Sequence, residues 1–180
     1  MPYRGINYTK SAVLSEDKAH RYLLRRQWAQ GGRTTLFVML NPSTADAEQD
    51  DQTIRRCASF AASFGCFGME VVNLYSYRAT LPDELRAQKY PTGGSENDRH
   101  LREAVARAHI VICAWGANAQ PARAAEVLDL IASTGKIPMC LGVTNSGAPK
   151  HPLYLSLTKT KLVSVNEART KMQAEKARPR

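Results

Sequence analysis

The sequence has no long apolar run and no closely spaced pair of cysteines. No stretch approaches the roughly 18 to 20 uninterrupted apolar residues that a transmembrane helix needs, and residues 1–10 lack the apolar segment of a secretory signal. We therefore expect a cytoplasmic protein that contacts no membrane. The four cysteines have no CxxC spacing of the kind that favours zinc or iron–sulfur centres, so we predict buried free thiols, no metal site and no cofactor. They are Cys57, Cys66, Cys113 and Cys140.

Internal repeats and low-complexity linkers are absent as well, and the length suits one domain. With 180 residues, 43% of them hydrophobic, the chain can build one core and is too short for two ordinary domains. Its formal charge of +9 favours a polyanionic partner such as DNA or a nucleotide, because Lys and Arg near phosphates release counterions. The same charge could serve solubility alone. We predict no obligate protein partner.

Much of the excess positive charge lies at the C-terminal end. From Lys159 onward the chain has seven Lys or Arg against two Glu. Such a segment is typical of a frayed, solvated terminus or of a flexible arm that contacts phosphates without reading sequence. We therefore predict a single domain over residues 1–165 and a flexible basic tail over residues 166–180.

Four short apolar segments have the pattern of buried strands, and helical patterns connect them. The strand segments are 35–40, 69–75, 109–115 and 136–141, and the helical ones are 53–64, 95–108 and 121–133. This alternation predicts an α/β three-layer sandwich around a four-stranded parallel sheet, with strand order 2-1-3-4. Upstream, residues 20–28 precede Gly31 and Gly32 and predict an antiparallel edge strand, with a short helix as the alternative.

Polar and turn residues follow each of the four predicted parallel strands. Ligands of open parallel sheets bind beyond the carboxyl ends of the strands, where crossovers diverge to opposite faces. The loops selected by this rule are 41–53, 73–80, 115–118 and 142–152. We expect the functional site where these loops meet.

The first loop begins with Asn41, Pro42 and Ser43. The amide of Asn41 can accept from a water and donate to a ligand, or it can cap the turn. Ser43 and Thr44 add hydroxyls and main-chain amides near the start of the next helix, a setting that can hold an anion or a water. We predict catalysis for Asn41 and ligand binding for Ser43 and Thr44.

A cluster of carboxylates follows in the same loop, formed by Asp46, Asp50 and Asp51. These groups could supply a general base or hold a hydrated metal ion. Asp50 or Asp51 could equally cap the next helix. Asp46 is our candidate catalytic carboxylate.

The second and third loops offer groups that suit a nucleobase and a phosphate. Asn73 can make paired hydrogen bonds to a base edge or close a loop, and Tyr75 and Trp115 present flat surfaces for stacking. Arg78 can bind phosphate. An ion pair between Arg78 and a neighbouring carboxylate, Asp83 or Glu84, is the alternative.

The fourth loop carries His151 directly before a proline. Gly147 and Pro149 precede this histidine and are expected to hold its imidazole in one position. An imidazole in that setting can stabilise a developing oxyanion. We therefore assign His151 to catalysis.

These loops together resemble a bacterial family of unknown function, DUF1643, over roughly residues 20–157. The resemblance rests on several motifs read together, and the family implies no reaction. The motifs are Met39–Asp46, Asp51–Arg56, Val72–Tyr75, Arg78–Thr80, Ala114–Gly116 and Gly147–Tyr154.

The same loops, in the same order, are more remotely similar to the uracil-DNA glycosylase superfamily, chiefly its mismatch-specific branch. That resemblance implies a three-layer parallel α/β fold in which Asn41 positions the attacking water. It also implies that His151 stabilises the departing base. Leu153 or Tyr154 would then fill the space left by a flipped base.

The leading hypothesis is a glycosylase-like protein that binds nucleic acid or a nucleotide and hydrolyses an N-glycosidic bond. A module that binds a nucleotide or base without chemistry is the first alternative. A metal-dependent nucleotide hydrolase that uses Asp46, Asp50 and Asp51 is the second.

Overall fold

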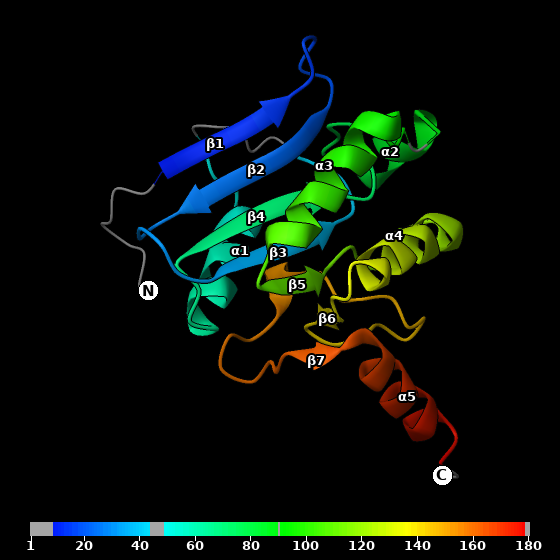
Figure 1. Ribbon diagram of the computed structural model, residues 1–180. Helices are drawn as coiled ribbons and strands as arrows, with labels where there is room; N and C mark the ends of the chain where they lie inside the picture. Colours follow the sequence, from blue (N-terminus) through cyan, green and yellow to red (C-terminus); the bar gives the residue numbers. More distant parts are fainter. Residues whose placement is uncertain (1–8, 44–48, 90, 179–180) are drawn as a thin grey trace.

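The computed structural model describes residues 9–43, 49–89 and 91–178, which form one seven-stranded mixed sheet with helices on both faces (Figure 1). The strand order is β1-β2-β4-β3-β5-β6-β7. The strands are β1 (Thr9–Leu14), β2 (Arg21–Gln27), β3 (Thr34–Met39), β4 (Gly68–Asn73), β5 (Ile110–Cys113), β6 (Pro138–Cys140) and β7 (Val163–Ser164). No helix within the described ranges has the length and apolar character to cross a membrane.

The centre of the sheet is parallel, in the order β4-β3-β5-β6. β3 lies in the middle, and Val38 pairs with Val72 on one side and Cys113 on the other. Every residue of β4, and every residue of β3 after Thr34, is buried, as expected for strands covered on both faces. The predicted four-stranded parallel centre and its order are confirmed.

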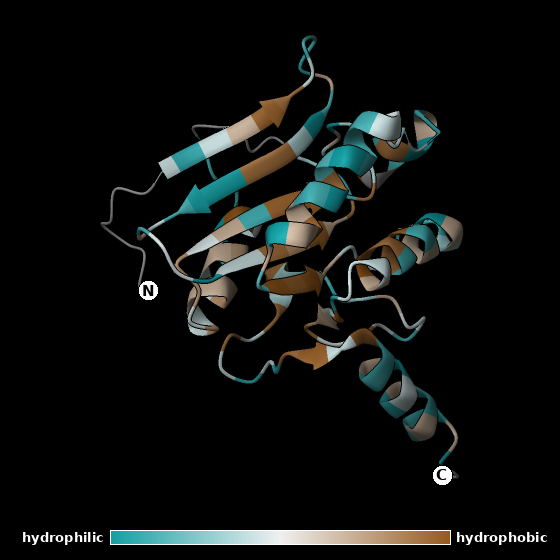
Figure 2. Cartoon of the chain, viewed as in Figure 1, coloured by the Kyte–Doolittle hydropathy of each residue, from teal (hydrophilic) through white to brown (hydrophobic). Residues whose placement is uncertain are grey.

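Helices cover both faces and create two cores. On one face, α1 (Gln52–Ser63) packs its apolar side, including Phe60, against β3 and β4. On the other, α3 (Gly94–Arg107) and α4 (Pro121–Ser133) bury residues such as Leu101 and Val127. A short α2 (Pro82–Ala87) precedes α3. Figure 2 shows the apolar residues concentrated in the central strands, with polar residues on the outer sides of the helices.

The N-terminal part of the sheet differs from the expectation. Residues predicted as an antiparallel edge strand form β2, which is antiparallel to β4 and is not helical. The edge assignment is wrong, because β1 pairs with β2 on its outer side. Four of the six residues of β1 are exposed, so its sequence lacks the apolar signal on which strand prediction depends. At the opposite edge, β7 pairs antiparallel with β6, which the sequence analysis also did not predict.

The range predicted to be a flexible tail contains most of a further helix, α5 (Val165–Lys176). Ser164 caps this helix by accepting a hydrogen bond from the main-chain N–H of Glu167 at 3.1 Å. Val165 and Ala168 are buried against β6 and β7. Two small apolar contacts three residues apart therefore fix a segment whose composition is otherwise polar and basic.

The four cysteines are free and buried, as predicted. Burial raises the pKa values of the Cys57 and Cys113 thiols well above their ordinary value, because a thiolate is poorly solvated there. These side chains are packing residues rather than nucleophiles.

Candidate functional site

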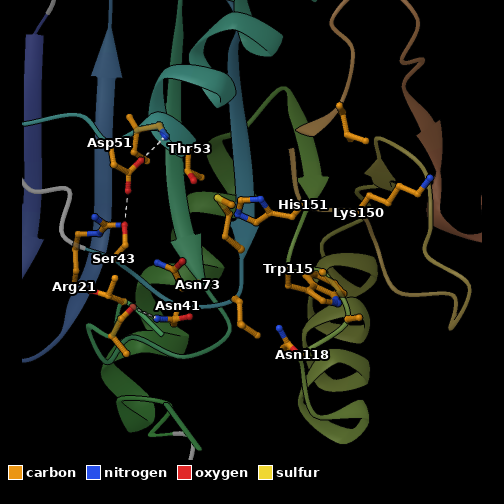
Figure 3. A pocket seen from close by; sticks show the side chains of 18 of the residues that line it. Arg21, Asn41, Ser43, Asp51, Thr53, Asn73, Trp115, Asn118, Lys150 and His151 are labelled. Atoms are coloured by element: carbon orange, nitrogen blue, oxygen red, sulfur yellow. Dashed lines mark hydrogen bonds between the residues drawn. The ribbon is translucent and has the colours of Figure 1, made fainter. Parts of the chain in front are cut away.

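A cavity of about 470 Å³ opens at the carboxyl ends of the parallel strands (Figure 3). β3, β4 and β5 end at its walls, and the loop that leads to His151 closes another side. The structure therefore brings together residues from all four loops that the sequence selected. The predicted site residues that line this cavity are Asn41, Ser43, Asn73, Trp115 and His151.

Four predicted site residues lie elsewhere. Tyr75 is buried in the core, and its phenol oxygen accepts from the main-chain N–H of Gln120 at 3.2 Å. Leu153 and Tyr154 belong to the short helix η1 (Pro152–Tyr154) and do not line the cavity, and Tyr154 is 90% exposed. Arg78 lines a smaller neighbouring cavity. The remaining predictions, Thr44 and Asp46, lie outside the described residues.

The guanidinium of Arg78 contacts the main chain rather than a carboxylate. It donates to the main-chain oxygen of Lys18 at 3.3 Å. Asp83 pairs with Arg86 instead, and Glu84 accepts from the main-chain N–H of Thr80. The predicted ion pairs of Arg78 with Asp83 or Glu84 are therefore not formed, because both carboxylates have local partners.

The amide nitrogen of Asn41 is hydrogen-bonded within the protein, and its amide oxygen faces the cavity (Figure 3). Its Nδ2 donates to the main-chain oxygens of Pro42, at 3.0 Å, and Ala79, at 2.7 Å. Both donor hydrogens are thus used to join the first two loops. Oδ1 is left as an acceptor, so the side chain both caps the turn and offers an oxygen to a ligand or water.

Asn73 is the last residue of β4 and is only 1% exposed. Its Nδ2 and Oδ1 both lack a hydrogen-bond partner among the described residues, although the side chain lines the cavity. Its main-chain oxygen is held by Nδ2 of Asn97 at 3.1 Å. Each buried unpaired polar group costs about 1–3 kcal/mol. A site that retains such an amide is suited to a ligand with an adjacent donor and acceptor.

Asp51 occupies the N-cap of α1 and is the one carboxylate among the described residues that line the cavity. It accepts from the main-chain N–H of Ile54 at 2.8 Å and from the hydroxyl of Ser43. The helix-capping alternative is therefore confirmed for Asp51. The hydrogen bond also ties the first loop to α1.

Asp50, in contrast, does not line the cavity. Its Oδ1 accepts from Nε of Arg26 at 2.7 Å, and the Arg26 side chain is 1% exposed. The described residues also contain no group of three or more His, Cys, Asp or Glu that could hold a metal ion. Asp50 thus has a structural role in the pairing of β2 with the start of α1.

Replacing Asp50 by Asn should lower the free energy of unfolding by about 3 kcal/mol, because it leaves the buried Arg26 guanidinium without this carboxylate. Urea denaturation of the two proteins measures the difference. Asp83→Asn is the matched control, because its ion pair with Arg86 is exposed and should contribute about 0.5 kcal/mol or less. An equal decrease in the free energy of unfolding in Asp50→Asn and Asp83→Asn would contradict the structural role of Asp50.

The imidazole ring of His151 points into the cavity (Figure 3). Its Nδ1 accepts from the main-chain N–H of Leu153 at 3.3 Å, which assigns the ring proton to Nε2 in the neutral imidazole. Burial lowers the pKa of His151, and the nearby Asp51 carboxylate opposes this shift. At neutral pH the site therefore holds an uncharged N–H donor.

The lowered pKa of His151 predicts how stability depends on pH. The unfolded chain binds a proton near pH 6.5, while folded His151 binds it only at lower pH. The free energy of unfolding should therefore fall as pH decreases from about 7 through 6.5 to the folded pKa, and should stop changing below it. His151→Gln should flatten this part of the profile, as measured by thermal melting across the range. A profile identical to that of the wild type would show that His151 is not the group responsible.

The family model described as Protein of unknown function (DUF1643) matches residues 21–153. The chain belongs to this family. Comparison with the curated proteins and with the solved structures finds no match. Of the residues that line the cavity, the DUF1643 range includes all except Leu155.

Other residues of the DUF1643 cavity were missed by the sequence analysis. Arg21 begins β2 and is 2% exposed although charged, and Lys150 comes directly before His151. An arginine on the buried side of a predicted strand is a usable signal, since such a charge needs a partner or a ligand. The other polar lining residues lie in the loops that the sequence selected but were not assigned a role there: Thr53, Thr80, Asn118 and Thr144.

Proposed function

We propose that this protein binds a nucleotide or nucleic acid through a nucleobase in the cavity and hydrolyses its N-glycosidic bond. The observation that carries the proposal is Asn73, whose buried amide offers a free donor beside a free acceptor. Nucleobases present complementary donors and acceptors side by side along one edge. The volume of about 470 Å³ lies in the range of small-molecule sites.

Trp115 supports the same class of ligand. The residue is 2% exposed and lines the cavity, to which it contributes part of an aromatic side chain. A flat base can stack on such a ring while its edge hydrogen-bonds to Asn73. Recognition would thus combine a stacking surface with a paired amide contact.

The proposed reaction breaks the bond between sugar C1′ and the base nitrogen. The bonding electrons leave with the base, the oxygen of water bonds to C1′, and the water proton passes to solvent or to the base. Oδ1 of Asn41 accepts from the attacking water. Nε2–H of His151 donates to the oxygen on which negative charge develops. The carboxylate of Asp51 favours the positive charge that develops on the sugar.

The roles of Asn41 and His151 agree with what the resemblance to the uracil-DNA glycosylase superfamily implies. Support comes from the convergence of Asn41, Asn73 and His151, from three separate loops, on one cavity. We keep Leu153 and Tyr154 as candidates for the residue that replaces a flipped base. Tyr154 fits this role better, because its ring is exposed rather than packed.

The second candidate is a module that binds the same ligand without chemistry. Both carboxylate oxygens of Asp51 already accept hydrogen bonds from the protein. Two of the four acceptor positions of the one carboxylate in the described lining are therefore occupied. This observation favours binding alone over any mechanism that needs a strong general base.

A base-release assay distinguishes the two functions. Purified protein is incubated with nucleotides and with DNA containing uracil, mismatched thymine, or oxidised or alkylated bases, and free base is measured by chromatography. Release that is lost in Asn41→Ala and kept in Asn166→Ala, an exposed asparagine of α5, supports hydrolysis. Binding that depends on Asn41 without release would replace hydrolysis by the binding module.

A further inference from the structure

Two further openings adjoin the cavity, on different sides. The first, of about 280 Å³, shares Ser43, Ala79 and Thr80 with it and is also lined by Lys18 and Arg78. We call it the β1–β2 groove, because Lys18 lies in the turn between those strands.

The second opening, of about 660 Å³, shares Lys150 and Leu155 with the cavity and extends along α5. We call it the α5 groove. Its cationic residues are Lys150, Lys159, Lys161 and Lys171, and its acidic residues are Glu167 and Glu175. The groove therefore has a net positive charge. Figure 3 shows Ser43 and Lys150 on opposite sides of the cavity, so the two grooves leave it in different directions.

The lysines of both grooves are available to a ligand. All five are exposed, and none forms an ion pair with a described residue. Elsewhere on the surface, several cations are paired with neighbouring acids, as Arg99 is with Glu96 and Glu103. The unpaired lysines thus mark the two exits of the cavity as cationic surfaces.

We propose that the ligand is a single-stranded polynucleotide, with one base in the cavity and backbone phosphates in both grooves. The proposal rests on the proposed function, since it assumes that the cavity holds a base. A free mononucleotide carries phosphate on one side of its sugar and can occupy only one groove. An internal nucleotide of a strand has a phosphate on each side, which matches a cavity with two cationic exits.

Tyr154 adds a further contact for a strand. It is 90% exposed and directly precedes Leu155, which lines both the cavity and the α5 groove. An exposed aromatic ring at this position can stack with the next base along the strand, a contact that tolerates any sequence. An unpaired strand is the form in which a base can enter a cavity without first leaving a duplex.

The test compares two classes of probe with two sets of variants. The probes are fluorescent homopolymeric single-stranded DNAs of about 12 nucleotides and the four deoxynucleoside monophosphates. One variant carries Lys18→Gln, and another carries Lys159→Gln, Lys161→Gln and Lys171→Gln. Lys89→Gln is a close control for the first, because Lys18 and Lys89 are both exposed and both have a positive φ, 58° and 54°. The triple Arg33→Gln, Lys89→Gln, Arg102→Gln removes three exposed charges outside the grooves and controls for the second.

Each groove variant should weaken binding of the DNA, and the α5-groove triple should raise its Kd about tenfold or more. The triple should also reduce the slope of log Kd against log salt by about 2, since each phosphate contact on a single strand contributes about 0.7. Binding of at least one mononucleotide should survive in the α5-groove triple, and both controls should behave as wild type. DNA binding that is lost in Asn73→Leu but unchanged in both groove variants would overturn this inference and leave the proposed function standing. If Asn73→Leu binds both classes of probe as tightly as the wild type does, the proposed function itself would be overturned.

Discussion

Replacing Asn73 by leucine is expected to abolish ligand binding while leaving the protein at least as stable as the wild type. The two side chains have similar size, and Asn73 is 1% exposed with no side-chain hydrogen bond to a described residue. Leucine therefore removes the cost of a buried unpaired amide, about 1–3 kcal/mol for each group, and breaks no side-chain hydrogen bond to a described residue. The same change removes both hydrogen bonds to the ligand.

The Kd for the preferred ligand should rise about a hundredfold or more, since two hydrogen bonds are lost in a desolvated site. Thermal melting without ligand and fluorescence titration with ligand measure the two effects separately. Asn73→Asp is a more specific variant, because it keeps the shape of the side chain and replaces the amide donor by a carboxylate oxygen, which accepts. It should reject the ligand as strongly as leucine does.

Asn97→Leu provides the matched control for Asn73. Asn97 is also fully buried, but its Nδ2 donates to the main-chain oxygen of Asn73 and it does not line the cavity. Its replacement should cost about 1 kcal/mol of stability, because that oxygen loses its partner. An Asn73→Leu protein that binds as tightly as the wild type would show that the cavity does not read a base edge through this residue.

The parallel centre of the fold could be predicted from the sequence because its strands are nearly continuous apolar runs. Phe37 and Val38, for example, are adjacent residues of β3 that belong to different cores, one on each face of the sheet. Only a strand covered on both sides needs apolar residues at successive positions. β1 gives no such signal, since it is held mainly by main-chain pairing with β2 and is largely exposed.

The site could be predicted as a set of loops, but not side chain by side chain. The carboxyl ends of parallel strands meet at one edge, so Asn41, Asn73 and His151 were placed together without any knowledge of their orientation. Tyr75 was misplaced because β4 ends at Asn73, and the strict alternation of faces no longer applies beyond it. Arg21 was missed because it comes from β2, an antiparallel strand that the rule for parallel sheets does not cover.

His151→Ala should lower the rate of base release by about 10²–10³-fold, the usual loss when one donor to a developing oxyanion is removed. Binding should change far less, because a neutral N–H contributes most where negative charge develops. Single-turnover rates measured together with Kd separate the two quantities. His109→Ala is the control, since His109 is exposed, precedes β5 and contacts Thr34 at the amino end of the sheet.

The conservative variant His151→Gln tests whether the lost rate is due to the N–H donor of His151. A glutamine amide can supply an N–H to the same oxygen, so part of the lost rate should return relative to alanine. The Nδ1 contact with Leu153 stabilises the loop, and both variants lose the ring that makes it. A purely structural role would therefore lower binding and rate together in both variants. A selective loss of rate that glutamine partly restores can come only from a hydrogen bond made in the transition state.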